Sequence, residues 1–297
     1  MKTTILYGNG VILLKRNKQW RHLLLDIAGC VNLPEIKDNT LLYEYIVLPQ
    51  PQYTPCDLVD CNGTRIMVSG KQVRVNVLTE KVVKKELEKK LVGGDSWFFD
   101  ELANLKANHY LTTNYEFQLN NKFKITRRIE FDFNDDREDL LFGHEIGVRD
   151  GEEVTIWNIH GSIRNPESIL LGMYEYSKYV VAINNLQNKE KREFNWVDLF
   201  MTTNVHIFGF GFGYEERDLW YVLTYRMRRI REGECFNNKI FYYAIKDRFY
   251  DQAKNMLLKA AGVEVVDIDF DTTTEDYDSS YRLIIEEYNK REYNCFC

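Results

Sequence analysis

The stretch TTILYGNG, Thr3 to Gly10, is a short apolar run that enters a glycine turn. Apolar residues recur at helical spacing after this turn, at Leu13, Trp20, Leu24 and Ile27. A strand, a glycine turn and a helix in this order open a βαβ unit. We therefore expect an α/β fold in which this first strand belongs to a parallel sheet.

Strand-like runs alternate with helical segments along the rest of the chain. The runs are HYLTTN (109–114), EEVTIWN (152–158), NVHIFGF (204–210), KIFYYAI (239–245) and VEVVDID (263–269). Three strand-like runs, including the first, end in glycine or in small polar residues. This alternation favours a Rossmann-like, doubly wound and mostly parallel sheet, with ligand-binding groups at the carboxyl ends of its strands.

A less regular region separates the first strand from the others. Residues 48–70 collect prolines and glycines and read as loop with short extended pieces, and Val73, Val75 and Val77 alternate as in a strand. EKVVKKELEKKL (80–91) and SWFFDELANLKAN (96–108) read as helices. Alternating apolar residues between 123 and 133 predict a strand or hairpin. We expect one domain over residues 1–297, with a Rossmann-like core at about 1–30 and 105–297 and a smaller helical and hairpin insertion at about 31–104.

Composition excludes several classes of protein. The chain of 297 residues is 44% hydrophobic and 28% charged, which is typical of a globular fold with a sizeable core. Its formal net charge of -6 supplies no global attraction to nucleic acid or to an anionic membrane, although a local basic patch stays open. No apolar run approaches the length of a membrane-spanning helix. We expect neither nucleic-acid nor membrane binding.

The chain also lacks the pattern of an exported or zinc-binding protein. Residues 27–30, IAGC, resemble a lipoprotein cleavage box, but the preceding KRNKQWRH is strongly polar and a signal sequence needs a continuous apolar centre. The six cysteines are scattered and include no CxxC pair. We therefore expect no metal site and favour the cytoplasm.

Two glycine turns are candidates for phosphate binding. Gly8 and Gly10 follow the first strand, where backbone amides and a helix amino terminus suit a pyrophosphate. The third glycine of the usual dinucleotide fingerprint is missing, because Leu13 occupies its position, so an ordinary βα turn stays open. IFGFGFG places Gly209 and Gly211 after another strand, where a plain turn with its phenylalanines in the core is the alternative.

Polar groups end two other strands. The apolar run that begins at His109 ends before Asn114 and Glu116. These two residues are either turn residues or ligand-binding groups at the sheet edge. His160 follows the run EEVTIWN, and a neutral imidazole there can accept a proton near physiological pH. A structural or exposed histidine is the alternative at this position. His206, inside a strand, is interpreted as a packed residue.

Together these motifs resemble the sirtuin-like family in its bacterial, defence-associated branch. GNG at Gly8 resembles the amino-terminal phosphate loop, and TTNYE (112–116) resembles the family's Thr-Thr-Asn-Tyr-Asp motif. HGSIRNPESILLGMYEY (160–176) resembles its histidine segment, and GFGFGYEERDLW (209–220) its glycine-rich strand end. The four motifs occur in the family's order over nearly the whole chain.

The resemblance implies an NAD site on this sequence. Asn114 and His160 are then the catalytic pair, and the residues that line the NAD are Gly8, Asn9, Gly10, Thr113, Glu116, Gly209 and Gly211. The chain departs from the family in three ways. It lacks the zinc module of paired cysteines, it lacks the cofactor loop after Gly10, and Glu116 replaces an aspartate. The first two departures argue against protein deacylation.

The activity implied is that of an NAD glycohydrolase, which cleaves the nicotinamide–ribose bond to give nicotinamide and ADP-ribose. Members of this branch act as anti-phage effectors, so the resemblance also implies a homo-oligomer. It further implies activation by a protein partner, such as an ATPase or a nucleic-acid-guided protein. The alternatives are a module that binds NAD or ADP-ribose without turnover and, less favoured, a protein deacylase or ADP-ribosyl transferase.

Overall fold

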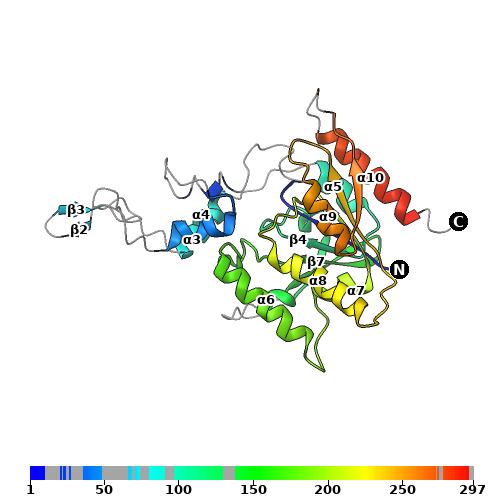
Figure 1. Cartoon of the computed structure of the whole chain (residues 1–297), viewed down its shortest axis with the longest axis horizontal. Coiled ribbons are helices and arrows are strands. Elements are labelled where there is room, and N and C mark those ends of the chain that lie inside the picture. Colours follow the sequence, from blue (N-terminus) through cyan, green and yellow to red (C-terminus); the bar gives the residue numbers. More distant parts are fainter. Residues whose placement is uncertain are drawn as a thin grey trace.

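A central sheet with helices on both sides organises the molecule (Figure 1). The computed structural model describes residues 1–10, 36–48, 66–68, 71–73, 80–90, 97–129, 138–271 and 277–293, and the single residues Arg21, Leu23, Leu24, Ile27 and Thr273. Most of the helix predicted after Gly10 lies outside these residues. Within the described ranges, no helix combines the length and the apolar character that crossing a membrane requires.

Eight strands form the sheet in the order β10-β9-β8-β1-β4-β7-β6-β5. Their bounds are β1 (Thr3–Tyr7), β4 (His109–Thr112), β5 (Lys124–Ile129), β6 (His144–Arg149), β7 (Glu152–Asn158), β8 (Asn204–Phe208), β9 (Ile240–Ile245) and β10 (Glu264–Ile268). Strands β10 to β7 pair in parallel, whereas β6 is antiparallel to both neighbours. The six parallel strands, numbered in chain order, are β1, β4, β7, β8, β9 and β10. Read across the sheet from β7 to β10, they have the 3-2-1-4-5-6 order of a Rossmann sheet. The predicted fold class is confirmed.

Helices surround this sheet, and a short hairpin stands apart from it. The α-helices among the described residues are α3 (Asn39–Val47), α4 (Glu80–Lys90), α5 (Trp97–Asn104), α6 (Met173–Gln187), α7 (Trp196–Thr202), α8 (Arg217–Arg231), α9 (Gln252–Ala260) and α10 (Tyr277–Tyr293). Strands β2 (Ile66–Val68) and β3 (Lys71–Val73) pair as an antiparallel hairpin. The helices predicted at residues 80–91 and 96–108 are confirmed in α4 and α5, although α5 ends at Asn104 and residues 105–108 are not helical.

Helices α3 and α7 and strand β6 have no counterpart among the sequence predictions, and β2 falls within residues 48–70, for which the sequence predicts loop with short extended pieces. Helix α7 shows why: at seven residues it is too short to display hydrophobic periodicity. Its start is set by reciprocal caps, because the Asn195 side chain accepts from the Val197 N–H and the Asp198 carboxylate accepts from the Asn195 N–H. The strand or hairpin expected at 123–133 is confirmed as β5 up to Ile129, and residues 130–133 lie outside the described ranges.

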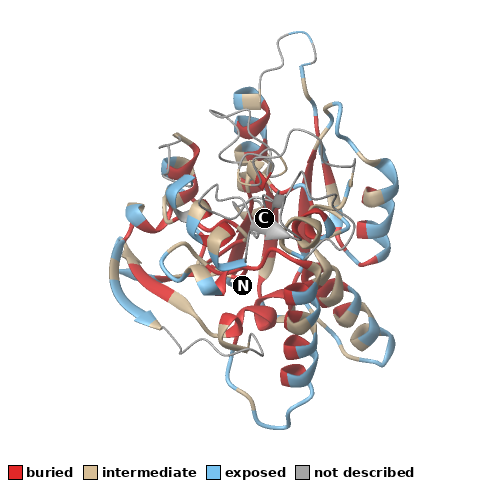
Figure 2. Ribbon diagram, turned by 90° about the vertical axis from the view of Figure 1, so that its left-hand side faces the viewer, coloured by how far each residue is buried: buried red, intermediate tan, exposed pale blue. Residues whose placement is uncertain are grey.

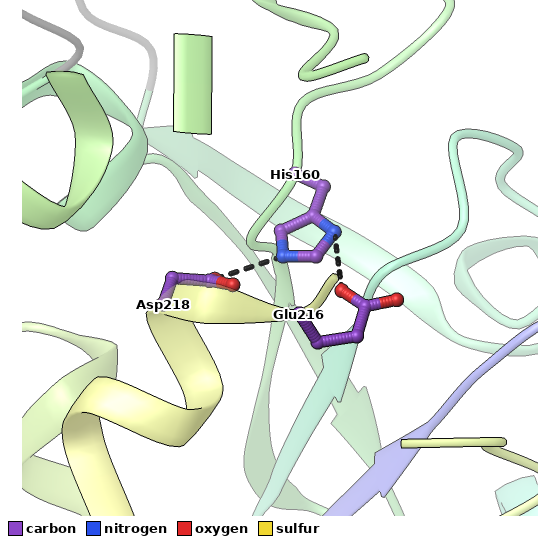
Figure 3. A group of neighbouring side chains, drawn as sticks. All are labelled: His160, Glu216 and Asp218. Carbon is purple, nitrogen blue, oxygen red and sulfur yellow. Dashed lines mark hydrogen bonds and ion pairs between the residues drawn. The ribbon is translucent and has the colours of Figure 1, made fainter. Parts of the chain in front are cut away.

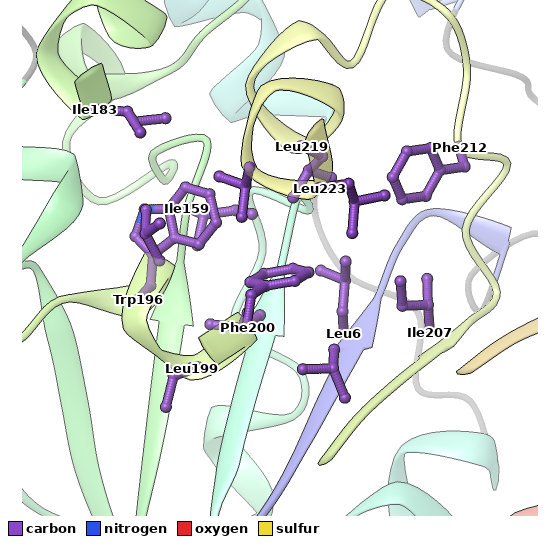
Figure 4. Packing of buried hydrophobic residues seen from close by; sticks show 14 of the residues in the cluster. Leu6, Ile159, Ile183, Trp196, Leu199, Phe200, Ile207, Phe212, Leu219 and Leu223 are labelled. Atoms are coloured by element: carbon purple, nitrogen blue, oxygen red, sulfur yellow. The ribbon is translucent and has the colours of Figure 1, made fainter. Parts of the chain in front are cut away.

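The two faces of the sheet carry separate hydrophobic cores, because successive residues of a strand point to opposite faces. Leu6 of β1 enters the core formed with α6, α7 and α8, whereas Ile5 and Tyr7 enter the core formed with α5 and α10. Figure 4 shows the first core, in which side chains of α7 and α8 close on Leu6 and Ile207. Burial is accordingly highest in the sheet and on the inner helix faces (Figure 2).

Helices α3 and α4, which belong to the predicted insertion, form a third core with the loops after β4 and β7. Its buried members are Leu24, Leu42, Tyr43, Val83, Leu87, Tyr115, Ile169 and Leu171. Arg217 at the start of α8 also donates to Asp38, the N-cap of α3, at 2.9 Å. The insertion boundaries stay a prediction, and α5, which falls within them, packs on the sheet.

Candidate functional site

The two predicted glycine turns meet at the point where the sheet topology reverses. Strands β1 and β8 are neighbours in the middle of the sheet, and the chain continues from them toward opposite edges. The Gly10 N–H donates to the Gly209 carbonyl at 2.8 Å, and a Cβ on Gly10 would lie only 2.7 Å from that oxygen. Gly10 is therefore required by the contact between the turns, and one amide expected to face a pyrophosphate is used inside the protein.

The remaining residues of these turns differ in their surroundings. A Cβ on Gly8 would lie 2.4 Å from the Phe210 ring, so Gly8 too is explained by close packing. Asn9 is half-buried, and Gly209 has a φ of 59°, a conformation that favours glycine. Gly211 is exposed, and a Cβ there would meet nothing within 4 Å. Of the predicted glycines, Gly211 alone combines exposure with open space around its Cα.

Buried polar atoms end β4, the neighbour of β1. Thr113 is half-buried, whereas Asn114 and Glu116 are only 5% and 6% exposed. Turn chemistry accounts for the backbone, because the Asn114 N–H donates to the Thr112 hydroxyl at 3.0 Å. It does not account for the side chains: Asn114 Nδ2 and Glu116 Oε1 have no hydrogen-bond partner among the described residues.

The charge state of Glu116 follows from this burial. Loss of solvent raises the pKa of its carboxyl to about 7, although its own backbone N–H and the nearby Asn114 amide oppose the shift. Near neutral pH, Glu116 can be either a hydrogen-bond donor or an acceptor.

The loops after β4 and β7 are joined by hydrogen bonds, which brings the segments of Asn114 and His160 together. Asn158 Nδ2 donates to the Asn114 carbonyl at 3.0 Å. The Tyr115 hydroxyl donates to the Leu170 carbonyl at 2.7 Å, and the Leu170 N–H donates to the His160 carbonyl at 2.9 Å. The two proposed catalytic residues therefore lie on one interlocked pair of loops.

His160 is fully enclosed and makes polar contacts through both ring nitrogens. Nε2 lies 2.9 Å from Asp218 Oδ2, and Nδ1 lies 3.8 Å from Glu216 Oε2 (Figure 3). Nδ1 also lies 3.2 Å from the Tyr176 hydroxyl. Burial alone would lower the pKa of His160, but the charge and hydrogen bond of Asp218 and the charge of Glu216 outweigh it and raise the pKa. The ring is held in one orientation.

The acids that hold His160 come from the amino terminus of α8. Asp218 is completely buried in the first turn of the helix, where the backbone N–H groups favour a negative charge. Burial raises the pKa of Glu216 to about 7, opposed by the charge of His160 and supported by the charge of Asp218. Sequence reasoning missed both acids. Their signal was the acidic run directly after a glycine-rich strand end, at the start of a helix.

These three residues are also the one group among the described side chains that could hold a metal ion, since one ligand atom of each lies within 4.8 Å of the others. Nε2 of His160, however, is already hydrogen-bonded to Asp218. The described geometry is that of an acid–imidazole pair, and we do not assign these residues as metal ligands. Another acid at the carboxyl end of the sheet, Asp267 of β10, accepts from the Tyr250 hydroxyl at 2.8 Å.

A separate cavity of about 190 Å³ borders the loop of His160 on the side of β5 and β6. Its lining includes Asn158, Gly161, Arg128 and Arg164, but not Asn114, Glu116 or His160. Gly161 is required next to the histidine, because its φ is 86° and a Cβ would lie 2.3 Å from the Ser168 carbonyl. The cavity and the candidate site thus share a wall but not their polar groups.

Neither a protein-family model nor a curated protein matches the chain. The sirtuin-like resemblance and the roles that it implies stay predictions. The His206 interpretation is confirmed, since this residue is buried and lies between the Tyr243 hydroxyl at 2.8 Å and Glu292 at 2.9 Å.

Proposed function

We propose that this protein is an NAD glycohydrolase, which cleaves the nicotinamide–ribose bond and yields nicotinamide and ADP-ribose. One observation supports this most: Asn114 Nδ2 and Glu116 Oε1 are buried without partners at the carboxyl edge of a Rossmann sheet. Buried polar atoms are normally paired, so orphaned ones in such a place suit a bound polar ligand. An amide and a carboxyl are groups that ribose hydroxyls can satisfy.

Cleavage of the nicotinamide–ribose bond needs no general acid from the protein. Nicotinamide leaves as a neutral molecule from a cationic ring, so no proton must be supplied to it. What the protein must provide is a fixed ribose and stabilisation of the positive charge that develops on the sugar. In this proposal the Asn114 amide orients the ribose, and the Glu116 carboxylate binds a hydroxyl and favours that charge.

His160 supplies the base in this proposal. A neutral imidazole accepts a proton from a ribose hydroxyl or from the attacking water. Its pKa is raised, so the basic form increases as the pH rises through that pKa. Loss of turnover at low pH is the expected consequence.

The diphosphate fits best near Gly211. Lys254 Nζ lies there, 2.6 Å from the Gly211 carbonyl oxygen, and brings a positive charge to an exposed glycine. The acids Glu215, Glu216 and Asp218 make the start of α8 itself unfavourable for phosphate. Lys254 is therefore the cation we expect to accompany the predicted glycine turn.

The biological setting is proposed from the resemblance alone. We propose a cytoplasmic anti-phage effector that forms a homo-oligomer. It would be inactive until infection is sensed, and a protein partner, an ATPase or a nucleic-acid-guided protein, or its own oligomerisation would activate it.

The test is release of nicotinamide from NAD, measured by liquid chromatography with the protein alone and with the products of neighbouring genes. We expect turnover that Asn114→Ala and His160→Ala each abolish. His109→Gln is the matched control, because His109 begins β4 at the opposite end of the same strand and should leave turnover unchanged. The proposal fails if every condition lacks turnover that depends on Asn114 and His160.

One observation favours a second candidate, a module that binds NAD or ADP-ribose without cleaving it. His160 is 1% exposed and both of its nitrogens have partners, so the described structure leaves it no free contact with a substrate. Calorimetry that shows binding without product would support this alternative. Nicotinamide release that requires an acylated peptide would instead support the deacylase.

A further inference from the structure

His160 lies between two acids that come from one helix start but face different ring nitrogens. Asp218, in the first turn of α8, is 2.9 Å from Nε2. Glu216, the residue before the helix, is 3.8 Å from Nδ1 (Figure 3). The Tyr176 hydroxyl also lies near Nδ1, at 3.2 Å. The geometry therefore distinguishes the two nitrogens.

A neutral imidazole has one N–H, and its position is set by the hydrogen bond that each nitrogen makes. An ionised carboxylate can only accept, and Asp218 lies where the amino terminus of α8 stabilises negative charge. Nε2 must then hold the proton. This leaves the lone pair on Nδ1, and it stays open to a proton when the Tyr176 hydroxyl, 3.2 Å away, donates instead to Glu216 Oε2 at 3.5 Å.

The two acids also differ in their access to solvent. The Asp218 side chain is completely buried, whereas the Glu216 side chain is 18% exposed. The raised pKa of Glu216, about 7, lets its carboxylate take up a proton near neutral pH. Tyr176 and Tyr179 on α6, Tyr115 on the β4 loop and Glu215 also act electrostatically within this cluster. The Tyr176 hydroxyl lies 3.2 Å from Nδ1 and 3.5 Å from Glu216 Oε2, so it bridges the imidazole and Glu216, the partly exposed end of this path.

On the basis of the proposed NAD cleavage, we infer that Asp218 is a positioning residue that holds His160 as the Nε2–H tautomer. Nδ1 is then the proton acceptor, and Glu216 removes the proton. Water forms a bond to the ribose carbon while the bond from that carbon to nicotinamide breaks. The electron pair of the broken bond stays on the nicotinamide ring nitrogen and neutralises its positive charge. The proton of the water passes to Nδ1; Nδ1 then gives a proton to the Tyr176 oxygen while the Tyr176 hydroxyl gives its own to Glu216, which releases it to solvent. The balance is NAD and water to nicotinamide, ADP-ribose and one proton.

The tautomer can be measured without any turnover. The chain has five histidines, so a long-range ¹H–¹⁵N spectrum of the imidazoles is simple, and His160→Gln identifies the signals of His160. In the wild type above the pKa of His160 we expect the Nε2–H form. Asp218→Asn should shift the population toward Nδ1–H and lower the pKa of His160, because the Asn amide can donate to Nε2. Glu216→Gln should retain the Nε2–H form.

Turnover of NAD is the second readout. Loss of an acid that sets the imidazole tautomer reduces kcat by up to about 10⁴-fold, so we expect a fall of at least about 100-fold in Asp218→Asn. In Glu216→Gln we expect a smaller fall and a changed pH profile. Asp198→Asn is the matched control. Asp198 is also a buried acid in the first turn of a helix, α7, but it pairs with Arg192 and lies away from the site. This variant should alter neither the His160 spectrum nor the pH profile.

The outcomes separate the two proposals. A wild-type Nδ1–H tautomer, or an unchanged tautomer and pKa of His160 in Asp218→Asn, would overturn the role of Asp218. A pH profile in Glu216→Gln identical to that of the wild type would overturn the role of Glu216. If the tautomer responds as expected but no condition gives NAD turnover, the positioning by Asp218 stands and the proposed reaction fails.

Discussion

At the scale of the residue, the candidate site holds groups that weaken the folded state. Asn114 and Glu116 are buried with unpaired polar atoms, and an unpaired buried group costs about 1–3 kcal/mol. Glycines show the opposite case, since Gly8 and Gly10 are required by the contact between two turns. Residues that reduce stability are therefore better candidates for ligand binding here than residues that packing already explains.

Glu116→Gln should stabilise the protein at high pH. The pKa of Glu116 is raised from 4.5 to about 7, so the folded state binds more protons than the unfolded state between these values. The free energy of unfolding then falls as the pH rises through this window, and above it the loss is roughly 3 kcal/mol. We expect Glu116→Gln to raise the melting temperature at pH 8 and to change it little at pH 4.5.

Glu145→Gln is the control for this measurement. Glu145 is also a buried carboxyl, but it accepts from Arg128, Arg164 and Asn120. Its replacement should lower the melting temperature at pH 8. A Glu116→Gln variant destabilised as much as Glu145→Gln at pH 8 would contradict a Glu116 carboxylate whose Oε1 lacks a partner.

At the scale of the element, helices of the predicted insertion hold the loops of the site in place. Lys84 of α4 pairs with Glu175 of α6 at 2.5 Å, and both side chains are at most 3% exposed. The Glu175 carboxylate also accepts from the backbone N–H of Leu171 and Gly172. This ion pair therefore connects α4 to the segment that follows His160.

Lys84→Met should destabilise the protein by about 3–5 kcal/mol, because it leaves a buried carboxylate without its cation. The double variant Lys84→Met with Glu175→Gln should recover much of that loss, measured by urea unfolding. Lys89→Met is the matched control: Lys89 pairs with Glu86 on the same helix but is 69% exposed, so a change below about 1 kcal/mol is expected. Equal losses for Lys84→Met and Lys89→Met would show that the buried pair has no special role.

At the scale of the whole molecule, the topology concentrates the polar strand ends at one edge. β1, β4, β7 and β8 are neighbours and parallel, so Gly8, Asn114, His160 and Gly209 all follow carboxyl ends of adjacent strands. Such a switch point is where open α/β sheets bind ligands. The described molecule thus offers one edge on which both glycine turns and both loops can contact the same ligand.

ADP-ribose should stabilise the folded protein through this edge. A ligand at 100 times its Kd adds about 2.7 kcal/mol to the free energy of unfolding, which corresponds to a rise of several degrees in melting temperature. The increment should fall in Asn114→Ala. It should also fall in Gly211→Ala, whose added Cβ meets nothing within 4 Å and should leave the unliganded melting temperature unchanged. Equal rises in melting temperature on adding ADP-ribose to the wild type, Asn114→Ala and Gly211→Ala would show that the ligand binds elsewhere.

The sequence by itself determined the fold class and most of the elements, because hydrophobic periodicity and glycine punctuation are local signals. It also pointed to the strand ends at Asn114 and His160 as polar positions in an apolar frame. Only the tertiary structure decided which groups meet. Asp218 contacts His160 from 58 residues away along the chain. The Gly10 N–H donates to the Gly209 carbonyl, although the two glycine turns are far apart in the sequence. Such pairs depend on strand order and loop geometry, which are set by packing between distant segments and leave no local pattern.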